Sequence, residues 1–310
     1  MSFKILLANA RGMCAGVYRA INTVEKALDK YGPDKVYVLH EVVHNAHVVA
    51  DLKKLGAHFV DSLEEVPPQS VLIFSAHGVS EEIEQQARNL EFTIIDATCP
   101  VVTGIHRKMN LAAKRGQEAV VIGHPGHQEV IGTIGQYLGD KSKVHVILTA
   151  EDVEKLNLDG DNAFFATQTT LSVDETKRTV AALKARFPNI QGPKSDDTCN
   201  ATQERQNAVR ELAKLCDIVI IAGSANSSNS NRLREVALAE KTKAYLIDDS
   251  TQFDLKWLEG VNNLGLTAGA SAPEYVIDDI IAFLNAHGAC CCESVGPQAH
   301  DRVFPLPKEI

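Results

Sequence analysis

Apolar residues follow two alternating patterns along this chain. In one they form short continuous runs, and in the other they recur at helical spacing, as at Val17, Ala20 and Val24 within residues 17–31. Short apolar runs bounded by turn residues are typical of buried strands in parallel sheets. The regular alternation of such runs with helical segments predicts an α/β protein built from parallel sheets.

The individual elements can be placed from this pattern. We expect a strand at the N-terminus within residues 4–14, and further strands at residues 35–39, 58–60, 71–75, 92–96, 118–123, 144–148, 163–167, 217–223, 243–248 and 262–267. Helices are expected at residues 17–31, 45–52, from Ser80 onward, 101–116, 172–187, 201–215 and up to His287. Ser172 and Glu175 have the spacing of a capping box at the start of one of these helices.

Three cysteines recur at comparable positions in this pattern. Cys14 stands in RGMCAG, Cys99 in DATCPVVT and Cys199 in DDTCNATQ. Each follows a segment that is expected to end a strand, including residues 192–199, and each precedes a helical segment. The chain therefore reads as three similar units that meet near their cysteines.

Polar loops repeat with the same period. The first loop of each unit contains His44, His127 or Ser228, and the second contains His77, Thr169 or Ser271. These loops follow apolar runs, and ligands of parallel α/β proteins bind at the carboxyl ends of strands. We therefore expect three pseudo-symmetric parallel α/β lobes around a central site. The lobes would span residues 15–99, 100–196, and 1–14 together with 197–287, so that the first strand closes the third lobe, with 288–310 as a C-terminal tail.

Composition and charge narrow the function. The chain has 310 residues, 45% of them hydrophobic, and a net charge of −9, so no overall field attracts nucleic acid or anionic lipid. The N-terminal apolar run is too short for a secretory signal, and no run is long enough for a transmembrane helix. We expect a cytoplasmic protein with no membrane insertion and no nucleic-acid partner. Seven cysteines, an odd number, argue against a disulfide framework.

The three repeated cysteines are candidate ligands of an inorganic cofactor. Thiolates are the usual ligands of iron–sulfur clusters, and three of them on a four-iron cluster leave one iron open to another ligand. The alternative is that each cysteine is a buried core thiol, as isolated cysteines usually are. The shared position in the repeat favours the cofactor.

The loop residues are candidate ligands of a phosphate group. They are hydrogen-bond donors at predicted helix N-termini, and Gly78, Gly126 and Gly269 permit close approach of the backbone. The alternative for the Ser- and Asn-rich loop is turn formation alone. Glu129 is a candidate proton donor that Thr169 or Thr170 would orient, and the alternative is a glutamate that stabilises the first turn of a helix.

Taken together, these motifs resemble the 4-hydroxy-3-methylbut-2-enyl diphosphate reductase family of the non-mevalonate isoprenoid pathway. The matching segments are RGMCAGV, HEVVHN, FSAHGVS, DATCP, GHPGHQEV, TQTTLSVDET, NSSNSNRL and TAGASAP, and they cover nearly the whole chain. The resemblance implies a three-lobed fold around a 4Fe-4S cluster and an oxidoreductase that takes electrons from a ferredoxin or flavodoxin. The implied reaction removes the allylic hydroxyl of the diphosphate substrate and gives isopentenyl diphosphate and dimethylallyl diphosphate.

The resemblance also implies roles for individual residues. Glu129 would deliver protons, and Thr169 would lie beside the substrate alcohol, which binds the open iron. The cluster ligands would be Cys14, Cys99 and Cys199, and the diphosphate pocket would comprise His44, His77, His127, Ser227, Ser228, Asn229 and Ser271. Two features depart from the family pattern: Ala10 replaces a common proline, and the run Cys290, Cys291, Cys292 has no counterpart and no assigned role.

Two other functional classes are compatible with the residues alone. A non-redox module that binds a phosphate-containing ligand would use the same loops, although no GxGxxG or GxxxxGK[ST] motif supports it. A zinc hydrolase would use the same thiols and histidines, and metal analysis would distinguish it from an iron–sulfur enzyme.

Overall fold

The computed structural model describes residues 2–193, 197–300 and 302–310. The chain forms two compact units. Unit 1 comprises Met1–Tyr18, Val43–Asp51 and Asn200–Val303, and unit 2 comprises Arg19–Val42, Leu52–Cys199 and Phe304–Ile310. The helices α1 (Ala15–Tyr31) and α2 (Ala46–Lys54) therefore each contribute residues to both units.

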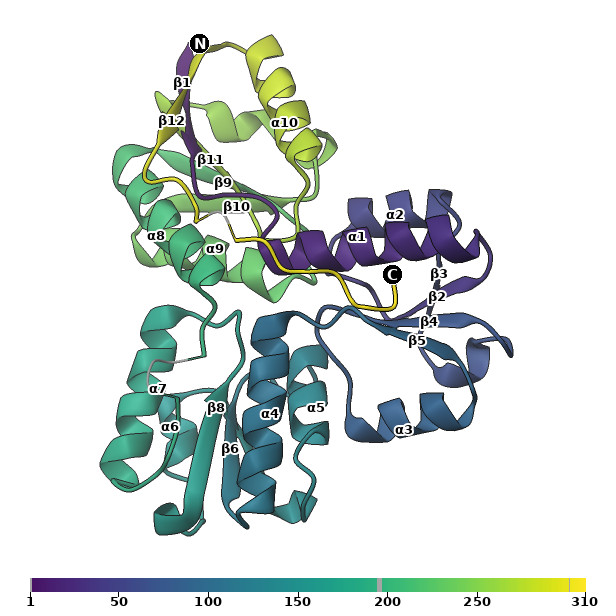
Figure 1. Cartoon of the computed structure of the whole chain (residues 1–310). Helices are drawn as coiled ribbons and strands as arrows, with labels where there is room; N and C mark the ends of the chain where they lie inside the picture. The colour runs from purple at the N-terminus through teal and green to yellow at the C-terminus, as the bar shows by residue number, and fades with distance from the viewer. Residues whose placement is uncertain (1, 194–196, 301) are drawn as a thin grey trace. The chain divides into compact units, whose positions relative to one another are not determined.

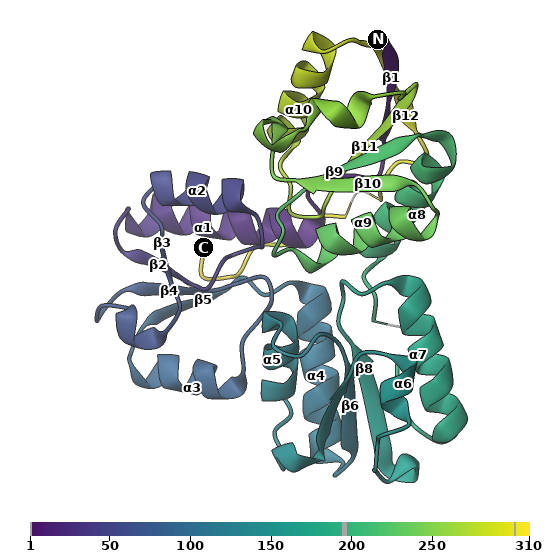
Figure 2. The same ribbon diagram turned by 180° about the vertical axis from the view of Figure 1, so that it is seen from behind.

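Unit 2 contains two of the three sheets in the described structure. The first is four-stranded, in the order β3-β2-β4-β5, and all of its strand pairs are parallel. Its strands are β2 (Val36–Leu39), β3 (His58–Val60), β4 (Val71–Phe74) and β5 (Thr93–Asp96). Helix α3 (Glu81–Asn89) packs on one face of this sheet, where Leu72 and Phe74 of β4 belong to the same hydrophobic cluster as Ala87. Figures 1 and 2 show α3 below the sheet and the unit 2 part of α1 above it.

The second sheet of unit 2 has three parallel strands in the order β7-β6-β8. They are β6 (Glu118–Ile122), β7 (Val144–Ile147) and β8 (Ala163–Thr167). Neighbouring residues of β6 point to opposite faces, so Val121 packs with the side of α4 (Pro100–Lys114) and α5 (Gln128–Gly135), whereas Val120 packs with the side of α7 (Val173–Arg186). A short helix α6 (Ala150–Val153) precedes β8. Both faces of the sheet are therefore covered, as the apolar runs predict.

Unit 1 is built on a five-stranded sheet in the order β10-β9-β11-β1-β12. Its strands are β1 (Phe3–Ala8), β9 (Ile218–Ala222), β10 (Lys243–Ile247), β11 (Asn263–Ala268) and β12 (Ala289–Val295). The N-terminal strand pairs in parallel with β11, with Lys4 opposite Asn263, so the prediction that the first strand closes the third sheet is confirmed. Helices α8 (Asn200–Leu215) and α9 (Ser228–Ala239) cover one face, and α10 (Glu274–Ala286) covers the other.

Short 3₁₀ helices occur in several connections. They are η1 (Leu63–Glu65), η2 (Lys141–Lys143), η3 (Gly160–Asn162), η4 (Ser250–Gln252) and η5 (Leu255–Leu258). The strand pairs described for all three sheets are parallel. Parallel strands must be joined by long crossover connections, and these usually contain an α-helix. The predicted fold class, α/β with three parallel sheets, is therefore confirmed.

The structure differs from the sequence-based predictions in two segments. Residues 288–310 were expected to be a tail, but Ala289–Val295 forms β12, an edge strand beside β1. The expected strand at residues 192–199 lies partly outside the described residues, since residues 194–196 are not described, and Asp197 to Cys199 are not in a strand. The predicted boundary between the second and third lobes, at residue 196, also lies outside the described residues. The lobe boundaries stay predictions.

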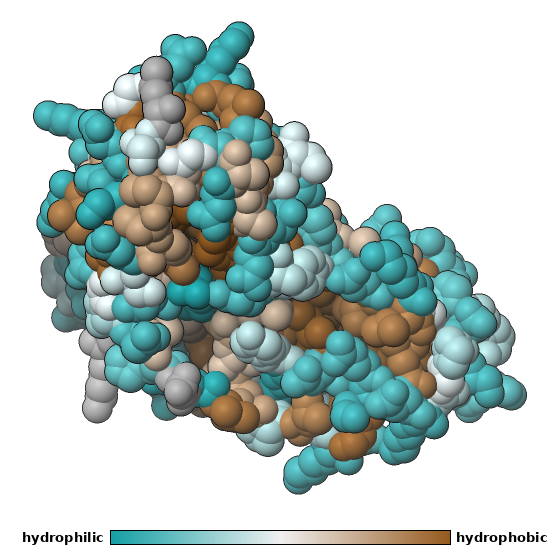
Figure 3. Space-filling view, turned by 90° about the horizontal axis from the view of Figure 1, so that it is seen from above, coloured by the Kyte–Doolittle hydropathy of each residue, from teal (hydrophilic) through white to brown (hydrophobic). Residues whose placement is uncertain are grey.

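The surface agrees with the composition. Hydrophilic residues cover most of the face shown in Figure 3, and the hydrophobic residues on it lie in small groups between them. In the described parts of the chain, no helix combines the length and the apolar composition needed to cross a bilayer.

Candidate active site

The three repeated cysteines occupy the same local position. Cys14 directly precedes α1, Cys99 is the N-cap residue of α4, and Cys199 directly precedes α8. All three are half-buried thiols. The N-terminus of a helix stabilises negative charge, so each position suits a thiolate ligand.

A backbone hydrogen bond links each cysteine to the second loop of a unit. The N–H donors and carbonyl acceptors are Cys14 to Ala270 (3.1 Å), Cys99 to Ala76 (3.0 Å) and Cys199 to Thr169 (3.2 Å). The acceptors adjoin or include the loop residues His77, Thr169 and Ser271 that the sequence places at equivalent positions. This shared bond shows that the repeat seen in the sequence is also a repeat of local structure.

The first loops show a second equivalence, at the second residue of the helix that follows each loop. In α5 this residue is Glu129, whose Oε1 accepts a hydrogen bond from the N–H of Thr169 (2.7 Å). In α9 it is Asn229, whose Oδ1 accepts one from the N–H of Ala270 (2.8 Å). Thr169 and Ala270 are also the residues whose carbonyls accept from Cys199 and Cys14, so each links a helix side chain to a cysteine.

Unit 2 gathers four of the predicted site residues. The rings of His77 and His127 meet edge to face with their centroids 5.8 Å apart. Nδ1 of His127 accepts a hydrogen bond from the N–H of Glu129 (3.1 Å), so the hydrogen of the neutral ring is on Nε2. Glu129 in turn contacts Thr169. We call these four residues the unit 2 cluster.

Glu129 is a buried acid of this cluster with a raised pKa. Its side chain is only 3% exposed, and it accepts hydrogen bonds from both the N–H (2.7 Å) and the hydroxyl (2.8 Å) of Thr169. Burial raises the pKa of Glu129 to about 7, while the two bonds from Thr169 oppose that rise and the charge of Asp197 adds to it. A carboxyl with a pKa near neutral pH is suited to general acid catalysis.

Asp197 is a residue that the sequence reasoning missed. It is buried, forms an ion pair with Lys108, and its Oδ2 accepts a hydrogen bond from the N–H of Thr167 (3.4 Å). It therefore places a negative charge near Glu129 at the end of β8. The signal in the sequence was an Asp shortly before Cys in both Thr-Cys motifs.

The loop that carries His77 rests on a neutral histidine. Gly78 has φ +73°, and a Cβ at this position would lie 2.5 Å from Cε1 of His106 and 3.0 Å from Cγ2 of Thr98. Burial lowers the pKa of His106 to about 4, so the imidazole is uncharged at neutral pH. Glycine is therefore required at position 78 both for its backbone conformation and for the close approach of His106.

Unit 1 gathers the remaining loop residues. Ser271 Oγ donates to the backbone carbonyl of His44 (2.9 Å), and Ser227 caps α9 by accepting from the N–H of Ser230 (3.3 Å). Ser228, half-buried, is the first residue of α9. We call His44, Ser227, Ser228, Asn229 and Ser271 the unit 1 cluster.

Asn229 has an unused donor in this cluster. Its Oδ1 is occupied by Ala270, but its buried Nδ2 has no hydrogen-bond partner among the described residues. An unpaired buried amide N–H₂ costs free energy, which an acceptor on a ligand would recover. Together with the N-terminus of α9, this donor fits a phosphate oxygen.

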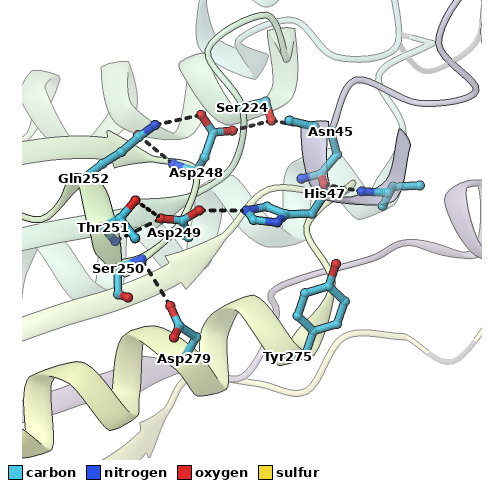
Figure 4. Close-up of polar contacts among 12 residues, drawn as sticks. Asn45, His47, Ser224, Asp248, Asp249, Ser250, Thr251, Gln252, Tyr275 and Asp279 are labelled. Atoms are coloured by element: carbon cyan, nitrogen blue, oxygen red, sulfur yellow. Dashed lines mark hydrogen bonds and ion pairs between the residues drawn. The ribbon is translucent and has the colours of Figure 1, made fainter. Parts of the chain in front are cut away.

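Polar contacts hold the loop that contains His44 against the five-stranded sheet. Ser224 Oγ accepts from the N–H of Ala46 (3.0 Å) and donates to Asp248 (2.5 Å), and Nε2 of His47 pairs with Asp249 Oδ2 (3.1 Å). Figure 4 shows these contacts. His47 is the second residue of α2, the position of Glu129 and Asn229 in their helices, yet its side chain is directed to Asp249.

Arg205 is a second residue that the sequence reasoning missed. It is 2% exposed, and its guanidinium donates to the carbonyl of Gly12 at 3.0 Å from Nε and 2.6 Å from one terminal nitrogen. It thereby fixes the loop that precedes Cys14. Nothing in its motif, ATQERQ, distinguished it from a surface arginine.

The predicted site residues therefore fall into two groups. Unit 1 holds its cluster and Cys14, whereas unit 2 holds its cluster with Cys99 and Cys199. In the described chain, no group of three or more His, Cys, Asp or Glu side chains is placed to hold a metal ion. The donor chemistry nevertheless fits an iron–sulfur cluster, because three thiols share one local environment at helix N-termini.

Parallel sheets with a cysteine before three of the helices and polar loops at the ends of strands place this chain in the class of α/β proteins. The model of the LytB protein family matches residues 5–285, and the chain belongs to this family.

Relatives and solved structures give the same answer. Proteins named 4-hydroxy-3-methylbut-2-enyl diphosphate reductase from Aeromonas hydrophila and Pseudoalteromonas translucida are 52% and 49% identical, over 99% of this chain and 98% and 99% of theirs. The solved structure of the E-1-hydroxy-2-methyl-but-2-enyl-4-diphosphate reductase from Plasmodium falciparum is 36% identical, with a TM-score of 0.92 over 99% of this chain and 96% of that one. These matches confirm the resemblance seen in the motifs and the expectation that the chain is an enzyme of this family.

Proposed function

We propose that this protein reduces 4-hydroxy-3-methylbut-2-enyl diphosphate to isopentenyl diphosphate and dimethylallyl diphosphate. The names of its full-length relatives support the substrate and the reductase activity. The unpaired buried amide of Asn229 in the unit 1 cluster supports a diphosphate ligand, and the buried acid of the unit 2 cluster supports a protonation step.

A 4Fe-4S cluster would be held by Cys14, Cys99 and Cys199. The cluster, when bound, supplies electrons and an iron with an open coordination position for the substrate hydroxyl. Three thiols at helix N-termini support this ligand set, because the helix ends help to stabilise the negative charge that thiolates and cluster carry.

The two clusters of loop residues would bind and orient the substrate. His44, His77, His127, Ser227, Ser228, Asn229 and Ser271 would hold the diphosphate. Several are neutral donors, and neutral donors at helix N-termini bind phosphate without a lysine or arginine. Such local donors can bind an anionic ligand even though the chain as a whole has a net negative charge.

Glu129 and Thr169 would deliver the proton. At the pKa of about 7, a substantial fraction of Glu129 is protonated at neutral pH. The Thr169 hydroxyl, 2.8 Å from Glu129 Oε2, can accept that hydrogen while donating its own to the hydroxyl oxygen of the substrate. The protonated hydroxyl would then leave as water when its C–O bond breaks. The buried Glu129–Thr169 pair is the observation that carries this proposal.

The test is anaerobic purification followed by iron and sulfide counts, electron paramagnetic resonance with and without the substrate, and product analysis under reducing conditions. The proposal requires about four irons and four sulfides per chain and both products. Zinc in place of iron would indicate a hydrolase, and tight diphosphate binding by metal-free protein without turnover would indicate a binding module. The electron donor, a ferredoxin or flavodoxin, and the cytoplasmic location remain predictions.

A further inference from the structure

Strand β12 contains Cys290, Cys291 and Cys292, to which the proposed reaction gives no role. It is an edge strand of the five-stranded sheet, and Figures 1 and 2 show it beside β1. Its register shifts at the start, since Phe3 lies opposite Ala289 whereas Lys4 lies opposite Cys291. Cys290 is therefore the extra residue of a β-bulge.

The bulge brings two neighbouring thiols together. Successive side chains of a regular strand point to opposite faces. At the bulge this alternation is lost, and the Sγ atoms of Cys290 and Cys291 lie 3.9 Å apart. Cys290 is an exposed residue and Cys291 is half-buried, and the Sγ of Cys290 also donates to the backbone carbonyl of Phe3 (3.3 Å).

The surroundings of the two thiols differ. A hydrogen bond from Ser2, with smaller contributions from Cys291 and Lys4, lowers the pKa of Cys290. Burial, and then the hydrogen bond with Cys290, raises the pKa of Cys291, whose Sγ lies 3.6 Å from Oε1 of Glu293. The opposite directions of the two pKa shifts make Cys290 the more acidic thiol of the pair.

We propose that Cys290 and Cys291 form a redox-reactive dithiol, in which Cys290 is the residue that a peroxide oxidises and Cys291 is the residue that resolves the product. An exposed cysteine with thiolate character beside a second thiol is the arrangement found in reversible redox sites. The site is independent of the cluster ligands, because it involves none of Cys14, Cys99 or Cys199.

The chemistry needs hydrogen peroxide as the oxidant and no other co-reactant. The Cys290 thiolate attacks one peroxide oxygen and breaks the O–O bond, which gives a sulfenic acid, while the released hydroxide takes up a proton and becomes water. The sulfur of Cys291 then attacks the Cys290 sulfur and expels the hydroxyl, which leaves as a second water with the Cys291 proton. Two thiols and one peroxide thus become one disulfide and two waters.

The disulfide would be readily reversed. Adjacent Cα atoms are about 3.8 Å apart across a trans peptide, below the usual range of about 4.4–6.8 Å for bridged cysteines. A bridge between neighbours is therefore strained and easily reduced by a small-molecule thiol. The bulge at Cys290 means that the bridge forms where the strand is already irregular.

Cys292 provides a matched control within the same strand. It is exposed, but it lies in the regular part of the ladder opposite Ile5, and burial raises its pKa. Since no Lys or Arg occurs between Lys256 and Arg302, trypsin releases residues 257–302 as one peptide that contains these three cysteines and no other. Oxidation at this site can thus be read separately from damage to the cluster ligands.

The experiment treats anaerobically purified, cluster-loaded protein with limiting hydrogen peroxide, blocks free thiols by alkylation and measures this peptide by mass spectrometry. Wild type and Cys292→Ser should give a peptide lighter by two hydrogen atoms, restored by dithiothreitol. Cys291→Ser should stop at a sulfenic acid on residue 290 that dimedone traps. Cys290→Ser should lose free thiols from the peptide about tenfold more slowly than Cys292→Ser, because its most reactive thiolate is gone.

Wild-type protein alone can overturn the proposal, whatever the variants do. Three alkylated cysteines in the peptide after peroxide has consumed thiols elsewhere in the chain would refute it. A wild-type disulfide that persists in Cys290→Ser, between residues 291 and 292, would refute the assignment of Cys290 as the attacked thiol. Equal iron content and equal circular dichroism spectra of the variants would show that the serine substitutions leave the fold intact.

Discussion

Thr169 donates two hydrogen bonds to the carboxylate of Glu129: the backbone N–H of Thr169 donates to Oε1 (2.7 Å), and its hydroxyl donates to Oε2 (2.8 Å). The carbonyl of the same threonine accepts the N–H of Cys199 (3.2 Å). One residue therefore links the buried acid of the unit 2 cluster to a proposed cluster ligand, and substitutions around it should change the protonation of Glu129 in opposite directions.

The first prediction concerns the pH dependence of turnover. The pKa of Glu129 is raised to about 7, so the acid form decreases as pH rises through 7, and kcat should fall with it. Glu129→Gln keeps the size of the side chain but has no proton to give, and kcat should fall by about 100-fold or more. Steady-state rates measured from about pH 5.5 to about pH 9 would test this prediction, because this range includes the expected midpoint. An unchanged high-pH limb in Glu129→Gln would contradict the assignment.

The second prediction uses the neighbours of Glu129. The hydroxyl of Thr169 stabilises the carboxylate and is the proposed proton relay, so Thr169→Val should lower kcat and move the midpoint of the remaining activity to higher pH, whereas Thr169→Ser should change neither. The charge of Asp197 disfavours the carboxylate, so Asp197→Asn should move the midpoint to lower pH. Shifts of the same sign in Thr169→Val and Asp197→Asn would show that the profile reports another group.

The third prediction concerns stability. Because the folded-state pKa of Glu129, about 7, lies above the unfolded value near 4.5, the folded state binds more protons between these values. The free energy of unfolding should therefore fall as pH rises from 4.5 to 7, by at most about 3 kcal/mol from this group. Denaturant unfolding of wild type and Glu129→Gln across this range measures the difference, which should shrink as pH falls toward 4.5. A difference independent of pH would exclude a buried titrating carboxyl.

Hydrophobic patterning predicted strands β1 to β11, including several edge strands, but not the edge strand β12. The strand β9 is apolar throughout and buried, so its run of Ile and Val identifies it directly. In β12 most residues are exposed, and the run ACCCESV carries no alternation, because an edge strand beside β1 buries little on either face. Its pairing depends on the position of β1, which the local sequence does not encode.

The candidate site residues were predictable where a sequence motif repeats along the chain. Glu129 and Thr169 lie in loops whose positions recur, and the structure brings them together. Asp197 and Arg205 were missed because each is buried by partners distant in sequence, Lys108 for one and the Gly12 carbonyl for the other. Asn45 was predictable from local sequence alone, because a polar residue directly before a helical pattern is a candidate cap, and its Oδ1 accepts a hydrogen bond from the N–H of Val48 (3.1 Å) at the start of α2.

The fourth prediction concerns the proposed cluster ligands. Cys14→Ser, Cys99→Ser and Cys199→Ser should each lower bound iron and sulfide and abolish turnover, because a serine oxygen is a poor ligand for cluster iron. Cys216→Ser is the control: burial raises the pKa of the Cys216 thiol to about 12, and this partly buried residue packs against the hydrophobic core of unit 1. Iron and sulfide counts on anaerobically purified protein give the measurement. Loss of iron in Cys216→Ser equal to that in Cys99→Ser would show that unfolding, and not ligand removal, causes the loss.

The fifth prediction separates backbone strain from side-chain contact in the His77 loop. Gly78 and Gly126 both have positive φ, +73° and +83°, so alanine at either position costs about 1 kcal/mol of stability for the backbone alone. At Gly126 a Cβ meets no heavy atom within 4 Å in the described structure, whereas at Gly78 it lies 2.5 Å from the His106 ring.

Gly78→Ala should therefore destabilise the protein by about 1–3 kcal/mol more than Gly126→Ala, the usual cost of overpacking a buried site. Because the loop must shift away from His106, His77 should also move, and KM for the diphosphate substrate should rise more in Gly78→Ala. Adding His106→Ala to Gly78→Ala removes the clashing ring, so KM should fall part of the way back to the wild-type value. Equal effects of the two glycine substitutions on stability and KM would mean that the close approach of His106 does not position the loop.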